Sequence, residues 1–173
     1  MNFMEFLKND NVIVNPLRIR SEYLNELEHN IVLYFTSTSR ESATIIKEQQ
    51  KNVTDKNEKS IEAMHQLKEQ ARMMKEALLK GRLHEIGEIL DFGFQQKRLM
   101  AKNISNQNIE DIYNVAKAAG ASGGKISGAG GGGFMFFYCP GNSRYHVIKA
   151  LNKFGGEVKN FSFTKHGMTS WSI

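Results

Sequence analysis

Residues 128–133, which read Gly-Ala-Gly-Gly-Gly-Gly, lie between two segments that have the apolar character of β-strands. Glycine loses more backbone entropy on folding than any other residue, so such a run needs a conformational or ligand-binding reason. Without Cβ atoms, successive N–H groups can converge on an anion and form a phosphate nest. Lys125 and Ser127 would add a positive charge and a hydroxyl beside it. The segment therefore predicts an anion-binding loop, with a flexible hairpin loop that binds nothing as the alternative.

Two common nucleotide-binding loops do not fit this run. Gly128, Gly130 and Gly133 have the spacing G-x-G-x-x-G, but the dinucleotide motif requires a helix after the glycines. Here residues 134–139, Phe-Met-Phe-Phe-Tyr-Cys, have the composition of a strand that is buried on both faces. A Walker A loop is excluded as well, because no Gly-Lys-Ser or Gly-Lys-Thr follows the glycines.

The rest of the chain alternates short apolar runs with long amphipathic segments. Apolar residues at spacings of three and four from Ile61 to Leu78 predict a long helix that ends near Gly81. Shorter helices are expected over residues 21–29, from the turn at 36–40 to about 52, and over 83–94, 109–119 and 147–154. Strands are expected over residues 12–14, 31–35, 125–127, 134–139, 158–163 and 170–173. This order predicts an α+β fold, with a layer of long helices over a mostly antiparallel sheet.

The formal charge of +5 limits the class of partner. Lysines and arginines are interleaved with acidic residues, as in the Lys-Asn-Glu-Lys sequence at 56–59, which indicates solvated helix faces and argues against nucleic-acid binding. An anionic small molecule is the other explanation for the positive charge. No apolar run of about 18 residues predicts a membrane span. Cys139 is the only cysteine, so no internal disulfide is expected, which fits a cytoplasmic protein.

The stretch from Lys125 to Gly133 also resembles the third motif of the GHMP kinase superfamily, Lys-x-Ser/Thr-Gly-Ala-Gly-x-Gly-Gly. Within the superfamily the chain is most similar to the D-glycero-D-manno-heptose 7-phosphate kinases. Segments at residues 2–6, 36–42, 83–99 and 104–121 continue this similarity. The resemblance implies that residues 1–173 are the ferredoxin-like C-terminal domain of such a kinase. It also implies that roughly the first 20 residues are the junction to an N-terminal domain.

The resemblance implies a function for the complete kinase. Enzymes of this branch transfer the γ-phosphate of ATP, with Mg²⁺, to the anomeric hydroxyl of D-glycero-D-manno-heptose 7-phosphate. The product supplies nucleotide-activated heptose for bacterial surface polysaccharide such as lipopolysaccharide. The alternatives are another GHMP sugar kinase, of the fucose or galactose type, and a non-catalytic binding module of the same fold.

The resemblance also indicates what this chain lacks. The family's N-terminal half carries a Pro-x-x-x-Gly-x-x-Ser-Ser phosphate loop, the Mg²⁺ ligands and the catalytic acidic residue, and neither Pro16 nor Pro140 lies in such a loop. Phosphoryl transfer needs a metal clamp and a positioned nucleophile, so we expect the chain alone to be inactive. Its expected partners are ATP, a sugar phosphate and the missing N-terminal half. Self-association is also expected, through an apolar face that this half would cover.

Candidate site residues follow from the motif and from charge. The loop residues expected to face ATP phosphates or substrate are Lys125, Ser127, Gly128, Ala129, Gly130, Gly131, Gly132 and Gly133. Arg40 follows a cluster of hydroxyls at an expected helix N-terminus and would contact a sugar phosphate, with a plain surface arginine as the alternative. Lys97 and Arg98 can reach the same anion or lie on a solvated helix face. The histidines lack metal-ligand spacing, so neither a metal site nor a catalytic residue is expected here.

Overall fold

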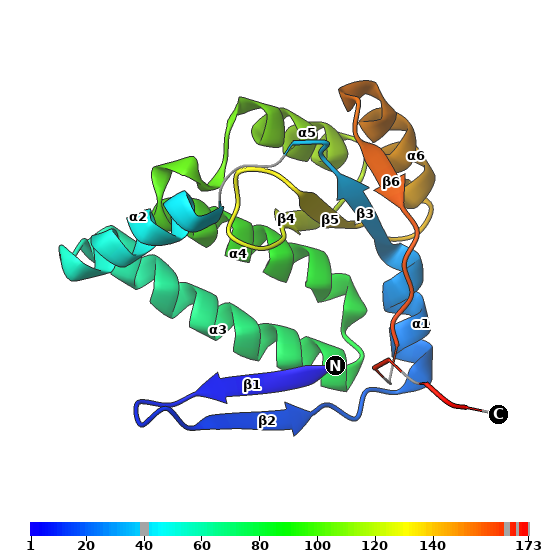
Figure 1. The fold of residues 1–173 in the computed structure, drawn as a ribbon. Coiled ribbons are helices and arrows are strands. Elements are labelled where there is room, and N and C mark those ends of the chain that lie inside the picture. Colours follow the sequence, from blue (N-terminus) through cyan, green and yellow to red (C-terminus); the bar gives the residue numbers. More distant parts are fainter. Residues whose placement is uncertain (39–41, 165–166, 169, 173) are drawn as a thin grey trace.

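The computed structural model describes residues 1–38, 42–164, 167–168 and 170–172 and has an antiparallel sheet at its centre (Figure 1). The sheet consists of β3 (Ile31–Phe35), β4 (Gly123–Ile126), β5 (Phe134–Tyr138) and β6 (Glu157–Lys159), in the order β4-β5-β3-β6. Helices lie between β3 and β4 and between β5 and β6, while β4 and β5 are joined directly. This connectivity is the βαββαβ pattern of a ferredoxin-like fold. The predicted α+β class with an antiparallel sheet is confirmed.

Helices lie on both sides of this sheet (Figure 1). The long helices α3 (Glu58–Lys80) and α4 (Ile86–Met100) pack together, and α4 runs along β4. The other helices are α1 (Ser21–Asn30), α2 (Ser42–Thr54), α5 (Gln107–Ala118) and α6 (Ser143–Leu151). Short 3-10 turns at Leu83–Glu85, Lys102–Ile104 and Asn152–Phe154 adjoin α4, α5 and α6. In the described part of the chain, no helix has the length and apolar composition needed to cross a membrane.

Side-chain alternation along the strands divides the core into two main clusters. Val32 and Phe137 point toward α5 and α6 and belong to the larger cluster. Tyr138 lies on the opposite face with residues of α1, α3 and α4, and Ile31 packs at the edge of this second cluster. Cys139, directly after β5, is fully buried in the larger cluster, and this burial raises the pKa of its thiol to about 12.

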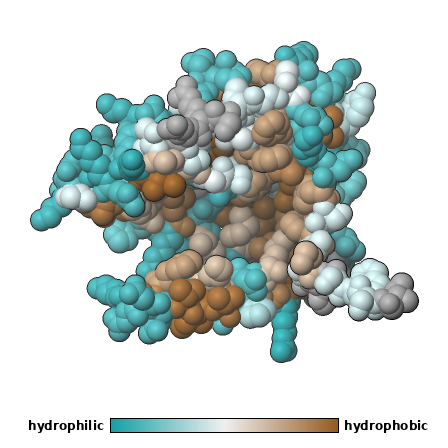
Figure 2. All heavy atoms as spheres, viewed as in Figure 1, coloured by the Kyte–Doolittle hydropathy of each residue, from teal (hydrophilic) through white to brown (hydrophobic). Residues whose placement is uncertain are grey.

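The first 16 residues form a separate two-stranded hairpin of β1 (Asn2–Phe6) and β2 (Val12–Pro16). It lies beside α3, where the Lys75 ammonium is 4.6 Å from the centre of the Phe3 ring (Figure 1). The sequence indicates β2 through its β-branched run at residues 12–14, but not β1, which has no such run and no buried face that would impose alternation. Apolar side chains are exposed along it, Phe6 to 75% and Val14 to 51%, and Figure 2 shows this apolar surface below the main body.

The structure corrects three expectations about strands. Residues 170–172 form no strand, contrary to the prediction for 170–173, and Ile173 lies outside the described residues. The strand expected over 158–163 is only Glu157–Lys159, since it pairs with three residues at the end of β3. Beyond it, Phe161 and Phe163 pack edge to face instead of pairing. β5 is not buried throughout on both faces, because the side chain of Phe134 is 39% exposed where the strand leaves the glycine loop.

Candidate functional site

The glycine run is the loop that joins the adjacent antiparallel strands β4 and β5. The Ser127 amide donates to the Phe134 carbonyl at 2.7 Å and closes the loop at its base. Within it, Gly128, Gly130, Gly131, Gly132 and Gly133 all have positive φ angles, between 70° and 155°. Residues with a side chain rarely adopt this backbone region, so the composition of the run follows from its conformation.

Close packing adds a second requirement at two of these glycines. A Cβ atom on Gly130 would lie 2.7 Å from the Ile104 carbonyl oxygen, and one on Gly132 would lie 2.5 Å from the Thr38 carbonyl oxygen. The loop therefore touches the backbone of two other segments, one before α2 and one before α5. A Cβ on Gly128 or Gly133 would meet no atom within 4 Å, so these two face open space.

Hydrogen bonds fix the loop to the same two segments. The Gly131 amide donates to the Ile104 carbonyl at 2.8 Å, and the Gly133 amide donates to the Thr38 carbonyl at 2.7 Å. Thr36, directly after β3, is buried; its amide donates to the Gly133 carbonyl at 2.8 Å, and its hydroxyl lies 3.0 Å from the Gly133 amide. These contacts hold the loop in one conformation, which a flexible hairpin loop that binds nothing would not need.

The remaining amides of the loop are available to a ligand. Within the described part of the chain, the amides of Gly128, Ala129, Gly130 and Gly132 have no protein acceptor. The loop lines a recess of about 220 Å³ together with the hydroxyl-bearing Ser127 and with Ser42 from the first turn of α2. Backbone amides and hydroxyls around a small recess are the donor set that phosphate oxygens accept from.

A second cleft, of about 370 Å³, adjoins this recess on the side of α3 and α4. Gly128 and Ala129 line both spaces. Lys97 of α4 extends to the loop, and its ammonium donates to the Gly128 carbonyl. Lys125 of β4 lines the same cleft, with its ammonium 5.7 Å from the centre of the Phe136 ring. The structure therefore brings two positive charges from distant parts of the sequence to one side of the glycine loop.

Both lysines of this cleft are partly withdrawn from water. Burial, with a smaller contribution from the charge of Lys125, lowers the pKa of Lys97 to about 8. Burial also lowers the pKa of Lys125. A lysine with a strongly lowered pKa inside a cleft, as Lys97 has, is typical of functional sites.

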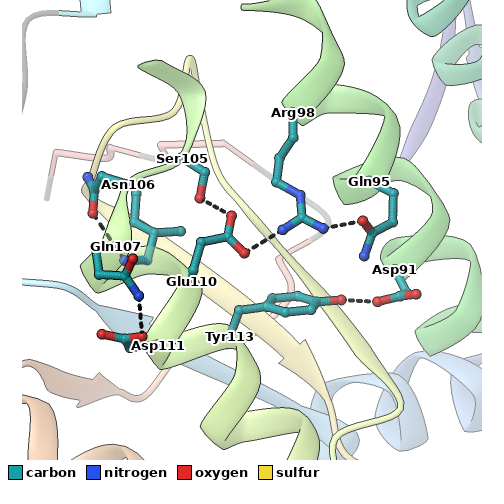
Figure 3. Close-up of polar contacts among 10 residues, drawn as sticks. Asp91, Gln95, Arg98, Ser105, Asn106, Gln107, Glu110, Asp111 and Tyr113 are labelled. Atoms are coloured by element: carbon teal, nitrogen blue, oxygen red, sulfur yellow. Dashed lines mark hydrogen bonds and ion pairs between the residues drawn. The ribbon is translucent and has the colours of Figure 1, made fainter. Parts of the chain in front are cut away.

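The other predicted substrate residues are placed differently. Arg98 points away from the cleft, toward α5, where its guanidinium pairs with Glu110 and also contacts Gln95 (Figure 3). A substrate contact by Arg98 would have to replace this ion pair, and it stays a prediction. Arg40 lies outside the described residues, so its expected contact with a sugar phosphate also stays a prediction.

Sequence reasoning missed the residues that hold the loop. Asn106 is one of them. Its side-chain oxygen accepts from the Ile109 backbone amide at 3.1 Å and caps α5, while its side-chain nitrogen donates to the Gly131 carbonyl at 3.3 Å. A capping signal was present in the sequence at Asn106, but nothing there indicated contact with the glycines. Thr36 is similar, because its role depends on the pairing of β3 with β5.

The residues around the two spaces suit an anion better than a metal ion. Lysine, glutamine and serine side chains line them, together with backbone amides, and no carboxylate does so among the described residues. No group of three His, Cys, Asp or Glu side chains in the described part of the chain is arranged to hold a metal ion. Mg²⁺ prefers carboxylate and phosphate oxygens, so these residues do not form a Mg²⁺ site by themselves.

Comparisons with known proteins identify the domain. Residues 74–157 match the family described as GHMP kinases C terminal. Over 172 residues the chain is 46% identical to the D-glycero-alpha-D-manno-heptose 7-phosphate kinase of Campylobacter jejuni, and the match covers 99% of this chain and 50% of that protein. The chain carries a GHMP kinase C-terminal domain. The resemblance inferred from the third motif is thereby confirmed.

Solved structures of similar proteins share this fold. A Campylobacter jejuni crystal structure, 45% identical, superposes with a TM-score of 0.72 over 99% of this chain and 48% of that one. The crystal structure of a D-glycero-D-manno-heptose 1-phosphate kinase from Bacteroides thetaiotaomicron, 36% identical, gives a TM-score of 0.69 over 99% of this chain and 45% of that one. The GHMP kinase C-terminal domain described here thus spans about half the length of its relatives.

Proposed function

We propose that this chain is the C-terminal part of an ATP-dependent sugar kinase that phosphorylates the anomeric hydroxyl of D-glycero-D-manno-heptose 7-phosphate. Its glycine loop would bind phosphate oxygens of ATP or of the substrate. Relatives that cover the whole chain are named as heptose phosphate kinases, although their names place the substrate phosphate at different positions. A kinase that uses ATP and a sugar phosphate would work in the cytoplasm.

The observation that carries this proposal is the fixed glycine loop with its unused amides. Four amides have no protein acceptor in the described part of the chain, while the neighbouring glycines Gly131 and Gly133 donate to the carbonyls of Ile104 and Thr38. Preorganised backbone dipoles of this kind stabilise charge on a phosphoryl group without any rearrangement during the reaction. In such a site, Ser127 would donate a hydrogen bond to a phosphate oxygen, and Lys125, from the adjoining cleft, would add positive charge nearby.

The chain cannot supply the rest of the reaction by itself. Phosphoryl transfer also requires a metal clamp and a group that positions the attacking hydroxyl. Among the described residues, those around the loop provide donors and positive charge but no carboxylate ligand. We therefore propose that an N-terminal kinase half completes the site, on the same polypeptide or on a separate one.

ADP release in the presence of MgATP tests this proposal. The purified 173-residue chain is assayed with heptose 7-phosphate, free heptose, galactose and fucose, alone and together with the N-terminal half of a heptose kinase. We expect turnover only when both halves are present, and with heptose 7-phosphate as the preferred acceptor. Turnover by the chain alone would contradict the half-enzyme proposal. Absence of sugar-dependent ADP release from the two correctly folded halves together would contradict the kinase assignment.

A further inference from the structure

The cleft beside the glycine loop has an unusual balance of charge. Its walls come from α2, α3, α4, β4 and the start of the loop, through Ile46, Gln49, Leu67, Gln70, Gly93, Lys97, Met100, Lys125, Gly128 and Ala129. Two lysines and two glutamines are the polar side chains in this set, and no aspartate or glutamate belongs to it. Neither lysine forms an ion pair with a described residue. Two partly buried cations therefore face one space in which no described residue supplies an anion to balance them.

This arrangement costs folding free energy. Moving an ammonium group out of water without a counter-ion is unfavourable, and a second cation nearby adds repulsion. The lowered pKa of Lys97 reflects both effects, and that of Lys125 reflects its burial. A ligand that carries two negative charges would remove both penalties at once.

We propose that this cleft binds a phosphate monoester dianion through the ammonium groups of Lys97 and Lys125, and that it thereby selects a phosphorylated sugar over a free one. This inference rests on the proposed sugar-kinase function and names the part of the substrate that the cleft recognises. The phosphate in question is the one the substrate already carries, not the one that is transferred.

The position of the cleft supports this assignment. The cleft and the recess of the glycine loop share Gly128 and Ala129, so one small molecule can extend from one space into the other. A sugar phosphate placed in this way has its phosphate against the lysines and its sugar ring toward the loop. The sugar hydroxyl that accepts the phosphoryl group would then lie toward the loop, on the side where the loop amides bind the phosphates of ATP.

Two glutamines give the cleft further contacts for such a ligand. The side-chain nitrogen of Gln70 donates to the Ile89 carbonyl at 2.9 Å. This bond fixes the Gln70 side chain and leaves its side-chain oxygen for a sugar hydroxyl. A Cβ on Gly93 would lie 2.0 Å from the Gln70 amide nitrogen, so glycine at this position makes room for the glutamine. The Gln49 side chain has no hydrogen-bond partner in the described part of the chain and can donate to a phosphate oxygen.

Direct binding to the 173-residue chain tests this inference without relying on catalysis. Isothermal titration compares D-glycero-D-manno-heptose 7-phosphate with the free heptose, a pair that differs only in the phosphate. Mannose 6-phosphate serves as a second monoester on a different sugar. The variants are Lys97→Met, Lys125→Met and Lys97→Arg, and Lys149→Met, at an exposed lysine of α6, is the matched control. Circular dichroism establishes that each variant is folded.

We expect the phosphorylated heptose to bind at least about tenfold more tightly than the free sugar. Each methionine variant in the cleft should lose about tenfold or more of that affinity, whereas Lys97→Arg should retain part of it and Lys149→Met all of it. Equal binding of the two heptoses, no binding of either monoester, or full affinity in both methionine variants would overturn the inference. Lysine-dependent binding of mannose 6-phosphate as tight as that of heptose 7-phosphate would support the inference and count against the proposed heptose substrate.

Discussion

Lys97, which we propose to bind the substrate phosphate, occupies a position that lowers the stability of the folded chain. Its aliphatic stem packs in the cleft, and its ammonium contacts the Gly128 carbonyl rather than a carboxylate. The groups that face it are Lys125 on β4, Gln49 on α2 and Gln70 on α3, none of which is an anion. A lysine on a fully solvated helix face, which was the alternative from the sequence, would not have its pKa lowered to about 8.

The pH dependence of stability follows from this shift. The pKa of Lys97 is about 8 in the folded chain and about 10.5 when the chain is unfolded. Between these values the unfolded chain binds more protons, so the free energy of unfolding should rise as pH increases from about 8 to 10.5. Lys97→Met should remove this rise and stabilise the chain at pH 7 by about 1–2 kcal/mol, after allowance for solvent screening. Urea unfolding at pH 7, 8, 9 and 10 measures both effects.

Lys149→Met is the control for this measurement, because the Lys149 side chain is exposed and lines neither the cleft nor the loop recess. It should leave both the stability and its pH dependence unchanged. A Lys97→Met variant that is less stable than the parent at pH 7 would show that the lysine has a structural role instead.

At the level of elements, the start of α5 serves both the helix and the loop. Asn106 caps α5 through its side-chain oxygen and contacts Gly131 through its side-chain nitrogen. Nearby, Ser105 and Arg98 both bind Glu110, which ties α5 to α4, and Tyr113 donates to Asp91 across the same interface (Figure 3). The position of the loop therefore depends on how α5 is attached to the domain.

Replacement of Asn106 by alanine separates these two roles when it is compared with Asn57→Ala. Asn57 caps α3 by accepting from the Ser60 amide at 3.1 Å and does not touch the loop. Both variants should lose about 1 kcal/mol of stability, the usual value of a helix cap. Only Asn106→Ala should shift the amide NMR signals of Gly131 and its neighbours. Equal shifts in both variants would contradict a direct link between α5 and the loop.

Sequence patterns predicted the elements whose signals are local. The apolar stripe from Ile61 to Leu78 gave α3, and Gly81 ends that helix with a φ of 69°, as expected of a C-cap. The glycines of the third motif predicted the loop, because their positive φ angles are rarely adopted by other residues. The lysine cleft was harder to predict, since Lys97 meets Gly128 only after α4 has packed along β4. Strand β1 was missed because, unlike β2, it has no run of β-branched residues, and its exposed faces impose no periodic signal.

Across the whole molecule, stability is unevenly distributed. The four-stranded sheet has a buried cluster on each face. In contrast, the hairpin of β1 and β2 has mostly exposed side chains and forms a sheet of only two strands. Isolated two-stranded hairpins are marginally stable in water, so the hairpin should open without unfolding of the rest.

Hydrogen exchange measures this difference directly. Amides of Glu5 and Ile13, which form a hydrogen-bonded pair of the hairpin, should exchange at least about tenfold faster than those of Val32 and Phe137, because opening of the hairpin exposes no core residue. The exchange of these two groups should also respond differently to low urea concentrations. Protection of the hairpin equal to that of the central strands would mean that another surface covers it in solution.

The thiol of Cys139 can report how often the central sheet of this domain opens. It is the only thiol in the sequence and is fully buried at the end of β5, and its raised pKa keeps it protonated at neutral pH. A thiol reagent can react with it only in molecules whose central sheet has come apart. Under excess reagent, the labelling rate then becomes the rate at which the sheet opens, which gives the lifetime of the folded state without denaturant or an introduced probe. A ligand that closes the lysine cleft would lengthen that lifetime, so one native sulfur atom can report both folding and occupancy of the site.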